Sequence, residues 1–259
     1  MSQRNSNRLA VVAALVMGSM LCTAAMGEVI VYQEGSVLLD DTQQDTEYTH
    51  LMSDIRSDDP DTNRGTDDRN VVGYLDSQGE MRIVMDFALD HIPAGSIIDS
   101  VSLDIKMPQG NSSGIGSIQE NFDVNLFEVT ADMTEDEVTW NDRTAGNDWN
   151  TDGGDFDPTI LSTINIDGAT DGDTIKTFAS SADFVTAAQD ALDNSHKLRL
   201  ILIGDPEQID GEEFFRVRTD DEDSLADRPA LSVTVVPEPA TMSLLALGGL
   251  GVLLRKRRR

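Results

Sequence analysis

A regular alternation of apolar and polar residues between positions 81 and 107 constrains the fold of this chain more than any other feature. Successive side chains of a strand leave it on opposite faces, so the alternation predicts two half-buried antiparallel strands. Pro93 and Gly95 supply a turn between them. The apolar positions are Ile83, Met85 and Phe87 in the first run, then Val101, Leu103, Ile105 and Met107 in the second. We expect this pair to form the spine of an all-β sandwich.

Short apolar runs separated by turn residues continue along the chain. They occupy 29–31, 37–39, 71–75, 122–126, 160–166, 175–178, 198–203, 214–218 and 231–235. Only residues 181–194 have helical spacing, with Ser180 or Ser181 as the cap. Residues 40–70 are polar and Asp-rich, and Tyr48, Leu51 and Ile55 are their only expected core anchors. The pattern predicts an antiparallel β-sandwich or jelly roll of about ten to twelve strands with one short helix.

Both ends of the chain have the composition of sorting signals. Residues 1–27 combine Arg4 and Arg8 with a short apolar run and small residues near a cleavage point, which is typical of a secretory signal peptide. An uncleaved anchor is the alternative, but the apolar run is shorter than a membrane span needs. The only cysteine, Cys22, lies in this segment, so the exported part has no disulfide.

At the other end, Pro237, Glu238 and Pro239 precede a short apolar segment and five terminal basic residues. Basic residues next to an apolar segment favour the cytoplasmic side of a membrane. The order of these pieces over 237–259 resembles the PEP-CTERM sorting signal. The resemblance implies cleavage near the Pro-Glu-Pro tripeptide by an exosortase-type enzyme and a secreted or surface location. The membrane would then be contacted only through this C-terminal helix, before processing; a plain C-terminal anchor is the alternative.

Charge narrows the classes of partner for the remaining domain, residues 28–236. Removing both signals takes away Arg4, Arg8, Glu238 and the five terminal bases, which leaves 12 basic and 46 acidic residues and a net charge of −34. Nucleic acids bind proteins through Lys and Arg on phosphates, so this balance argues against a nucleic-acid partner. It suits an exported, soluble domain and the binding of divalent cations.

The order of several short motifs resembles the secreted DNRLRE domain, which is classed with carbohydrate-binding module family 96. The matching pieces are Asn63–Gly65, Arg82–Phe87, Ile92–Gly95, Ser100–Ile105, Val138–Asn141, Ala182–Asn194 with Leu198–Ile203, and Arg228–Val235. The resemblance spans most of 28–236 and implies a β-sandwich that binds polysaccharide, of the alginate type in characterised members, without catalysis. The strong negative charge departs from what an anionic polymer would favour.

Three groups of residues are candidate binding sites. Asp59, Asp61, Asn63 and Asp67 alternate along one loop with Gly65, and oxygen ligands at this spacing suit Ca²⁺, although Arg64 occupies the position at which an EF-hand needs glycine. A solvated acidic loop is the alternative. Asp152, Asp155 and Asp157 form a weaker second candidate.

The tryptophans and a basic strand are the other two candidates. Trp149 lies in a polar loop and is the better sugar-stacking candidate, whereas Trp140 follows Val138 at a spacing of two and is expected in the core. Arg216 and Arg218 share one face of a strand, with Lys197, Arg199 and Arg228 nearby in the sequence, and this basic stripe could pair uronate carboxylates bidentately. Local pairing with Asp220, Asp221 and Glu222 is the alternative for these arginines.

Catalysis has little support in the sequence. The segment 110–114 satisfies G-x-S-x-G, but Pro108 interrupts the strand before it and no helical spacing follows, as a nucleophile elbow requires. We therefore expect an exported, non-enzymatic β-sandwich that binds polysaccharide in the envelope or extracellular matrix, with calcium as a possible cofactor. A structural matrix protein without a specific ligand is the alternative, and a polysaccharide lyase or hydrolase ranks below both.

Overall fold

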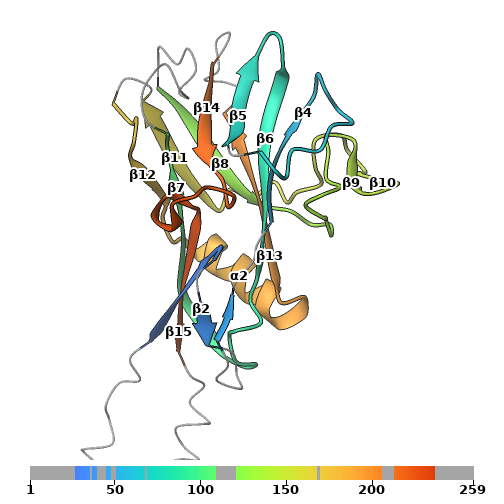
Figure 1. Ribbon diagram of the computed structural model, residues 1–259. Coiled ribbons are helices and arrows are strands. Elements are labelled where there is room, and N and C mark those ends of the chain that lie inside the picture. Colours follow the sequence, from blue (N-terminus) through green and yellow to red (C-terminus); the bar gives the residue numbers. More distant parts are fainter. Residues whose placement is uncertain are drawn as a thin grey trace, which may run out of the picture.

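Strands dominate the chain in a computed structural model, as the alternation predicts (Figure 1). The structure describes residues 27–35, 37–39, 45–47, 51–67, 69–108, 121–167, 170–205 and 213–236. The signal peptide, the Pro-Glu-Pro tripeptide, the C-terminal apolar segment and Tyr48 lie outside these residues. Within them no helix is long and apolar enough to cross a membrane. The predicted fold class, antiparallel β with one short α-helix, is confirmed.

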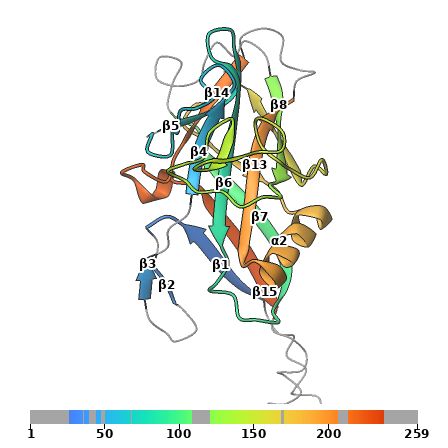
Figure 2. The same cartoon turned by 90° about the vertical axis from the view of Figure 1, so that its right-hand side faces the viewer.

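The smaller of the two main sheets joins the two ends of the domain. Its four strands are β1 (Glu28–Gln33), β15 (Ala230–Val236), β7 (Ile97–Lys106) and β12 (Ile175–Phe178), in that order and all antiparallel. Glu28 pairs with Val235, so the first strand begins where the last strand ends. Figures 1 and 2 show β1 and β15 together at one end of the molecule.

The larger sheet has seven strands and curls into a half-barrel. Along its main path lie β11 (Ser162–Asp167), β8 (Asn121–Glu128), β13 (Lys197–Gly204), β6 (Gly79–Ala88), β5 (Arg69–Leu75) and β14 (Glu213–Arg218). The seventh strand, β4 (Leu51–Arg56), pairs with β6 beside this path. Two small hairpins complete the strands, β2 (Val37–Leu39) with β3 (Asp45–Glu47) and β9 (Asp142–Thr144) with β10 (Asn147–Asp148).

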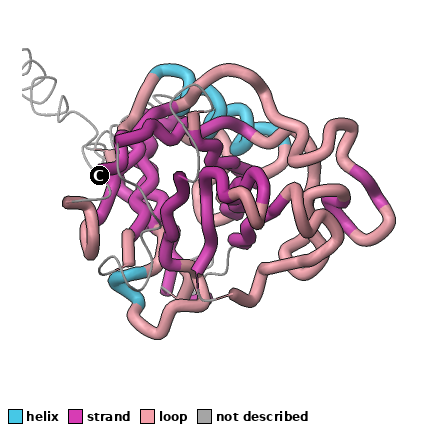
Figure 3. Tube along the Cα trace, turned by 90° about the horizontal axis from the view of Figure 1, so that it is seen from above, coloured by secondary structure: helices cyan, strands magenta, loops and turns pink. Residues whose placement is uncertain are grey.

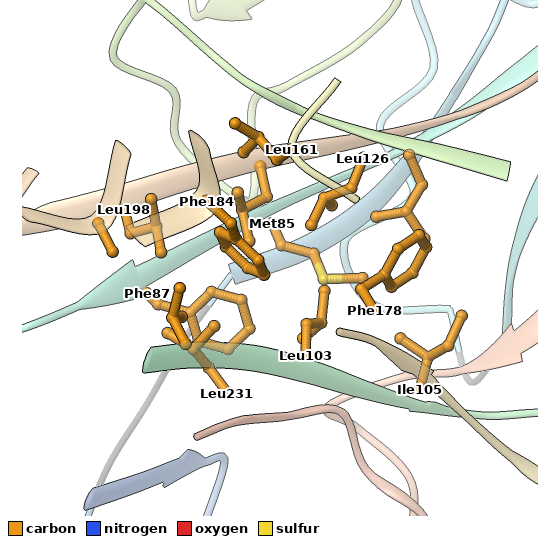
Figure 4. Packing of buried hydrophobic residues seen from close by; sticks show 14 of the residues in the cluster. Met85, Phe87, Leu103, Ile105, Leu126, Leu161, Phe178, Phe184, Leu198 and Leu231 are labelled. Atoms are coloured by element: carbon orange, nitrogen blue, oxygen red, sulfur yellow. The ribbon is translucent and has the colours of Figure 1, made fainter. Parts of the chain in front are cut away.

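The predicted spine strands are present as β6 and β7, but they belong to different sheets. The strand β6 pairs with β4, β5 and β13, whereas β7 pairs with β12 and β15. Their alternating apolar residues meet face to face across the main core instead of side by side in one ladder. Figure 4 shows Met85 and Phe87 of β6 near Leu103 of β7 and Phe184 of the helix. The turn between the strands is therefore a crossing from one layer to the other.

The helix α2 (Ala182–Asn194) covers part of this core. Ser181 is its N-cap, because its hydroxyl accepts a hydrogen bond from the Phe184 N–H at 3.0 Å. Phe184, Ala188 and Leu192 lie on the buried face, as helical spacing predicts. From above, strands fill the centre and the helix lies at the margin (Figure 3). A single 3₁₀ turn, Leu225–Asp227, precedes β15.

The polar stretch 40–70 contains a buried strand that the sequence pattern did not indicate. All six residues of β4 are buried, including Ser53 and Asp54. Polar groups at this depth need partners from other elements, and residue-by-residue alternation cannot show those partners. Leu51 and Ile55 are buried, as expected, but the strand that carries them was not predicted.

A second apolar cluster lies on the other face of the large sheet. It joins residues of β4, β6 and β13 to the long segment 129–157, and its members include Leu51, Ile55, Val84, Val129, Met133, Val138, Trp149, Ile201 and Ile203. The long segment therefore packs as a cover over the sheet. This cover explains why Val84, on the same face of its strand as Arg82 and Asp86, is fully buried, as is Ile201.

Candidate functional site: an arginine-lined pocket

Three arginines converge on one pocket at the end of the molecule opposite the paired first and last strands. The pocket has a volume of about 390 Å³, within the range of sites that hold small ligands. Its lining comes from β4, the β4–β5 loop, β5, β14 and the β5–β6 turn: Arg56, Asp67, Arg69, Val71, Leu75, Gln78, Phe214 and Arg216. Figures 1 and 2 show β5 and β14 at the top of the molecule, away from β1 and β15.

Antiparallel pairing of β5 with β14 places Arg69, Arg216 and Arg218 on one face of the sheet, and these three residues form the cationic wall. Arg69 lies directly opposite Arg218, and Val71 lies opposite Arg216. Residues directly opposite each other share a face of the sheet, so these side chains form one ladder. On β14 the buried Phe215 alternates with the half-buried arginines. The predicted shared face of Arg216 and Arg218 is thus present.

A buried ion pair lies beside this wall on β4. The Arg56 Nε donates to Asp54 Oδ2 at 2.5 Å, and the Asp54 side chain is fully buried. With the Asn70 amide oriented to satisfy both neighbours, its NH₂ donates to Asp54 Oδ1 at 3.2 Å and its oxygen accepts from the Ser53 N–H at 3.3 Å. Burial raises the pKa of Asp54 to about 6, although Arg56 acts in the opposite direction. Guanidinium has five donors, so Arg56 keeps donors beyond Nε.

The other basic residues of the predicted stripe do not reach the pocket. Lys197 binds Asp86 at 3.1 Å, and Arg199 pairs with Asp132. Arg228 donates to the backbone oxygens of Glu222 and Glu34 at 2.7 and 3.1 Å. Arg218 pairs with Glu222, so the local pairing considered as an alternative is present for this residue.

Arg64 organises the loop that was predicted to bind calcium. Its guanidinium lies 2.8 Å from Asp59 Oδ2 and 3.7 Å from Asp67 Oδ2. The Asn63 amide instead donates to the backbone oxygens of Glu135 and Val138 at 2.5 and 2.9 Å, which ties the loop to the cover segment. Among the described residues, no group of three or more His, Cys, Asp or Glu side chains could hold a metal ion.

The Asp61 side chain contacts the cover segment. It accepts a hydrogen bond from the Asn141 amide at 2.8 Å. Desolvation first, then the hydrogen bond and charge of Asp148, and last the charge of Asp61 raise the pKa of Asp142. In the weaker candidate, Asp155 accepts three N–H bonds from Asn150 and Thr151. These carboxylates therefore accept hydrogen bonds from other groups of the protein. Calcium binding at the loop stays a prediction.

Trp149 is the more deeply buried of the two tryptophans, whereas Trp140, which was expected in the core, packs against the second apolar cluster from its edge. Trp149 is only 4% exposed, and its Nε1 donates to the Thr139 carbonyl at 3.0 Å, so its ring cannot serve as a sugar platform. Trp140 is half-buried, and the Arg82 guanidinium lies 4.9 Å from its ring centroid. Gly153 has φ +86°, and a Cβ there would come within 2.7 Å of the Trp140 ring. Neither tryptophan is among the residues that line the pocket.

A buried pair of carboxyl groups was not expected from the sequence. Asp220, after β14, is 4% exposed and lies beside Glu135 of the cover segment. Burial first, and then the Glu135 charge, raise the pKa of Asp220 to about 9, so this carboxyl is protonated at neutral pH. Glu135 Oε1 also accepts from the Met52 N–H at 3.2 Å. The pair therefore ties the cover segment to β4 and β14.

The sequence pattern indicated only one of the three arginines of this pocket. Arg216 was singled out, but Arg56 and Arg69 were not, because more than 140 residues separate them from Arg216 along the chain. An i, i+2 pattern on one strand can show a shared face, yet it cannot show which other strands lie beside it.

Fold and site together define an antiparallel β-rich domain with a cationic pocket on an otherwise acidic chain. Residues 235–259 match the PEP-CTERM protein-sorting motif, which confirms the interpretation of the C-terminus. The motif marks the chain as a surface-sorted protein that an exosortase processes. No curated protein matches the chain by sequence.

Proposed function

We propose that this protein is a non-catalytic surface protein that binds an anionic polysaccharide through the arginine pocket. The observation that carries the proposal is the concentration of positive charge. Among the residues that the structure describes, Arg56, Arg69 and Arg216 line the pocket with one acidic residue, Asp67, in a chain with 47 acidic and 19 basic residues. Guanidinium groups pair carboxylate or sulfate oxygens in two-point contacts, which suits uronate or sulfated sugars.

The apolar part of the lining fits the other surface of a sugar. Val71, Leu75 and Phe214 stand beside the arginines, and a pyranose presents C–H groups to such side chains while its acidic substituent turns to the guanidiniums. The resemblance to the DNRLRE domain supports a carbohydrate ligand, and the sorting motif would place the pocket where surface polysaccharides occur.

Binding of purified protein to immobilised polysaccharides tests the proposal. The panel contains a polyuronate, a sulfated polysaccharide and a neutral glucan, each with and without calcium. Arg216→Gln removes one charge from the pocket and should weaken binding to the acidic polymers about tenfold or more. Arg143→Gln is the matched control, since Arg143 lies on β9 and does not line the pocket.

Two results of the binding series would exclude this site. The wild-type protein could bind no acidic polymer, or the Arg216→Gln protein could bind as well as wild type. Turnover of any polymer by the pure protein would contradict the non-catalytic part. Dependence on calcium in the parallel series would support the predicted calcium loop.

A structural surface protein without a specific ligand is the second candidate. The ion pairs of Arg56 with Asp54 and of Arg218 with Glu222 favour it, because they are the contacts that a purely structural stripe would make. The same binding series separates the two candidates, since a structural protein binds no member of the panel.

A further inference from the structure

The sorting motif begins inside a folded strand. The match starts at Val235, while β15 continues to Val236. Val235 pairs with Glu28 of β1 on one side and with Ile98 of β7 on the other, and its side chain is 4% exposed. Val235 is therefore an interior residue of the sheet, and Val236 is paired with Ile97 of β7.

A change of register separates these residues from the rest of β15. Thr234 pairs with Ser100, but Val235 pairs with Ile98, so Asp99 of β7 is left out of the ladder. Such a bulge interrupts the hydrogen bonding locally. The part of β15 beyond the bulge is Val235 and Val236, the same two residues that belong to the sorting motif. The end of the strand thus has a structural boundary at the start of the motif.

Little chain separates the sheet from the rest of the signal. Residues 237–239 are the Pro-Glu-Pro tripeptide, and the apolar run begins directly afterwards. Three extended residues span at most about 10 Å. Enzymes that cut a backbone act on exposed, accessible segments, and Val235, paired on both edges of its strand, does not provide one.

We propose that Val235 and Val236 have two mutually exclusive states, as the end of β15 and as part of the segment that the sorting enzyme binds. The exosortase then acts on a form in which β15 beyond the bulge has left the sheet. Because Glu28 pairs with Val235, the start of β1 must release this end as well. Completion of the sheet and sorting of the chain are coupled at this point.

A disulfide that holds the end of β15 in the sheet tests the proposal. Ile97 and Val236 are directly opposite each other, and Ile97 is 48% exposed, so Ile97→Cys with Val236→Cys can bridge β7 and β15 beyond the bulge. The full chain, with Cys22 as its only natural cysteine, is produced in a bacterium that has an exosortase. We expect loss of the processed form in the oxidised variant and its return after reduction.

The matched control is Ser102→Cys with Ser232→Cys, a directly opposite pair on the same two strands before the bulge. This variant should be processed like wild type. In a second variant, a flexible spacer followed by another Val-Val is inserted before Pro237 of the locked chain, which should restore processing. Normal processing of the fully oxidised Ile97/Val236 variant would overturn the proposal. Accumulation of precursor that reduction does not relieve would also overturn it, because the cause would then be the changed side chain.

Discussion

At the scale of single residues, Asp220 shows how one buried proton affects stability. Its pKa is raised from 3.8 to about 9 in the folded protein by burial and by Glu135. The folded state keeps the proton while the unfolded chain loses it, so stability should fall as pH rises from about 4 to about 9. Asp220→Asn removes the titration but keeps an N–H donor for Glu135. We predict a variant more stable than wild type at pH 8, by about 1–3 kcal/mol, and similar to it at pH 4.

Urea unfolding followed by circular dichroism at a series of pH values measures this effect. Asp223→Asn is the control, because Asp223 lies on the same loop and is exposed. The control should keep the wild-type pH dependence. A steep dependence that survives in Asp220→Asn would show that another group causes it.

Trp149 provides a second prediction at this scale. The residue is buried in the cluster beneath the cover segment, and its indole donates to the Thr139 carbonyl. Trp149→Phe keeps an aromatic ring but loses that hydrogen bond, so it should cost about 1–2 kcal/mol of stability. Binding to acidic polysaccharide should not change, because Trp149 does not line the pocket. A loss of binding without a loss of stability would return the residue to the role first predicted for it.

At the scale of elements, β4 is an example of a strand that an alternating sequence pattern does not reveal. The strands with alternating apolar residues, such as β8 and β15, were predicted close to their observed bounds. The strand β4 was missed because both of its faces are covered and Asp54 is satisfied by Arg56 and Asn70, which no local spacing shows. The cover segment was missed for the same reason, since loops that pack on a sheet have no periodic pattern.

The ion pair in β4 predicts that removing Arg56 alone lowers stability more than removing Arg56 together with the Asp54 charge. Arg56→Met leaves the Asp54 carboxyl buried without its guanidinium, which should destabilise the protein by about 3–5 kcal/mol. The double variant with Asp54→Asn removes the charge as well and should recover part of this loss. Free energies of unfolding from urea titrations give the coupling between the two positions. Equal stability of the single and double variants would mean that the buried charge contributes nothing.

At the scale of the whole molecule, the sequence supports the fold class better than the site. The two spine strands were identified correctly as strands, but their placement in separate sheets depends on partners far along the chain. The pocket depends on the same long-range pairing, since Arg69 and Arg216 become neighbours only when β5 pairs with β14. Local spacing therefore identified Arg216 and missed the residues that make it part of a pocket.

The contrast between the acidic molecule and its cationic pocket predicts an unusual salt dependence. The exported part carries 46 acidic and 12 basic residues, so an anionic polymer is repelled at long range. Salt screens charges separated by more than about 10 Å at 0.1 M, whereas contacts inside a pocket are screened less. We therefore expect affinity for a polyuronate to rise between about 10 and 100 mM salt, a range over which the Debye length falls from about 30 to 10 Å.

A surface that bound the polymer by scattered basic residues would behave in the opposite way, because added salt weakens such contacts steadily. Titrations of wild type and Arg216→Gln over the same salt series distinguish the two cases. Wild type should gain affinity on the first additions of salt, and the variant should bind weakly throughout, since screening relieves repulsion but cannot replace the missing guanidinium. A steady fall in wild-type affinity from the lowest salt would mean that the polymer contacts exposed bases outside the pocket, and the pocket would lose its role as the binding site.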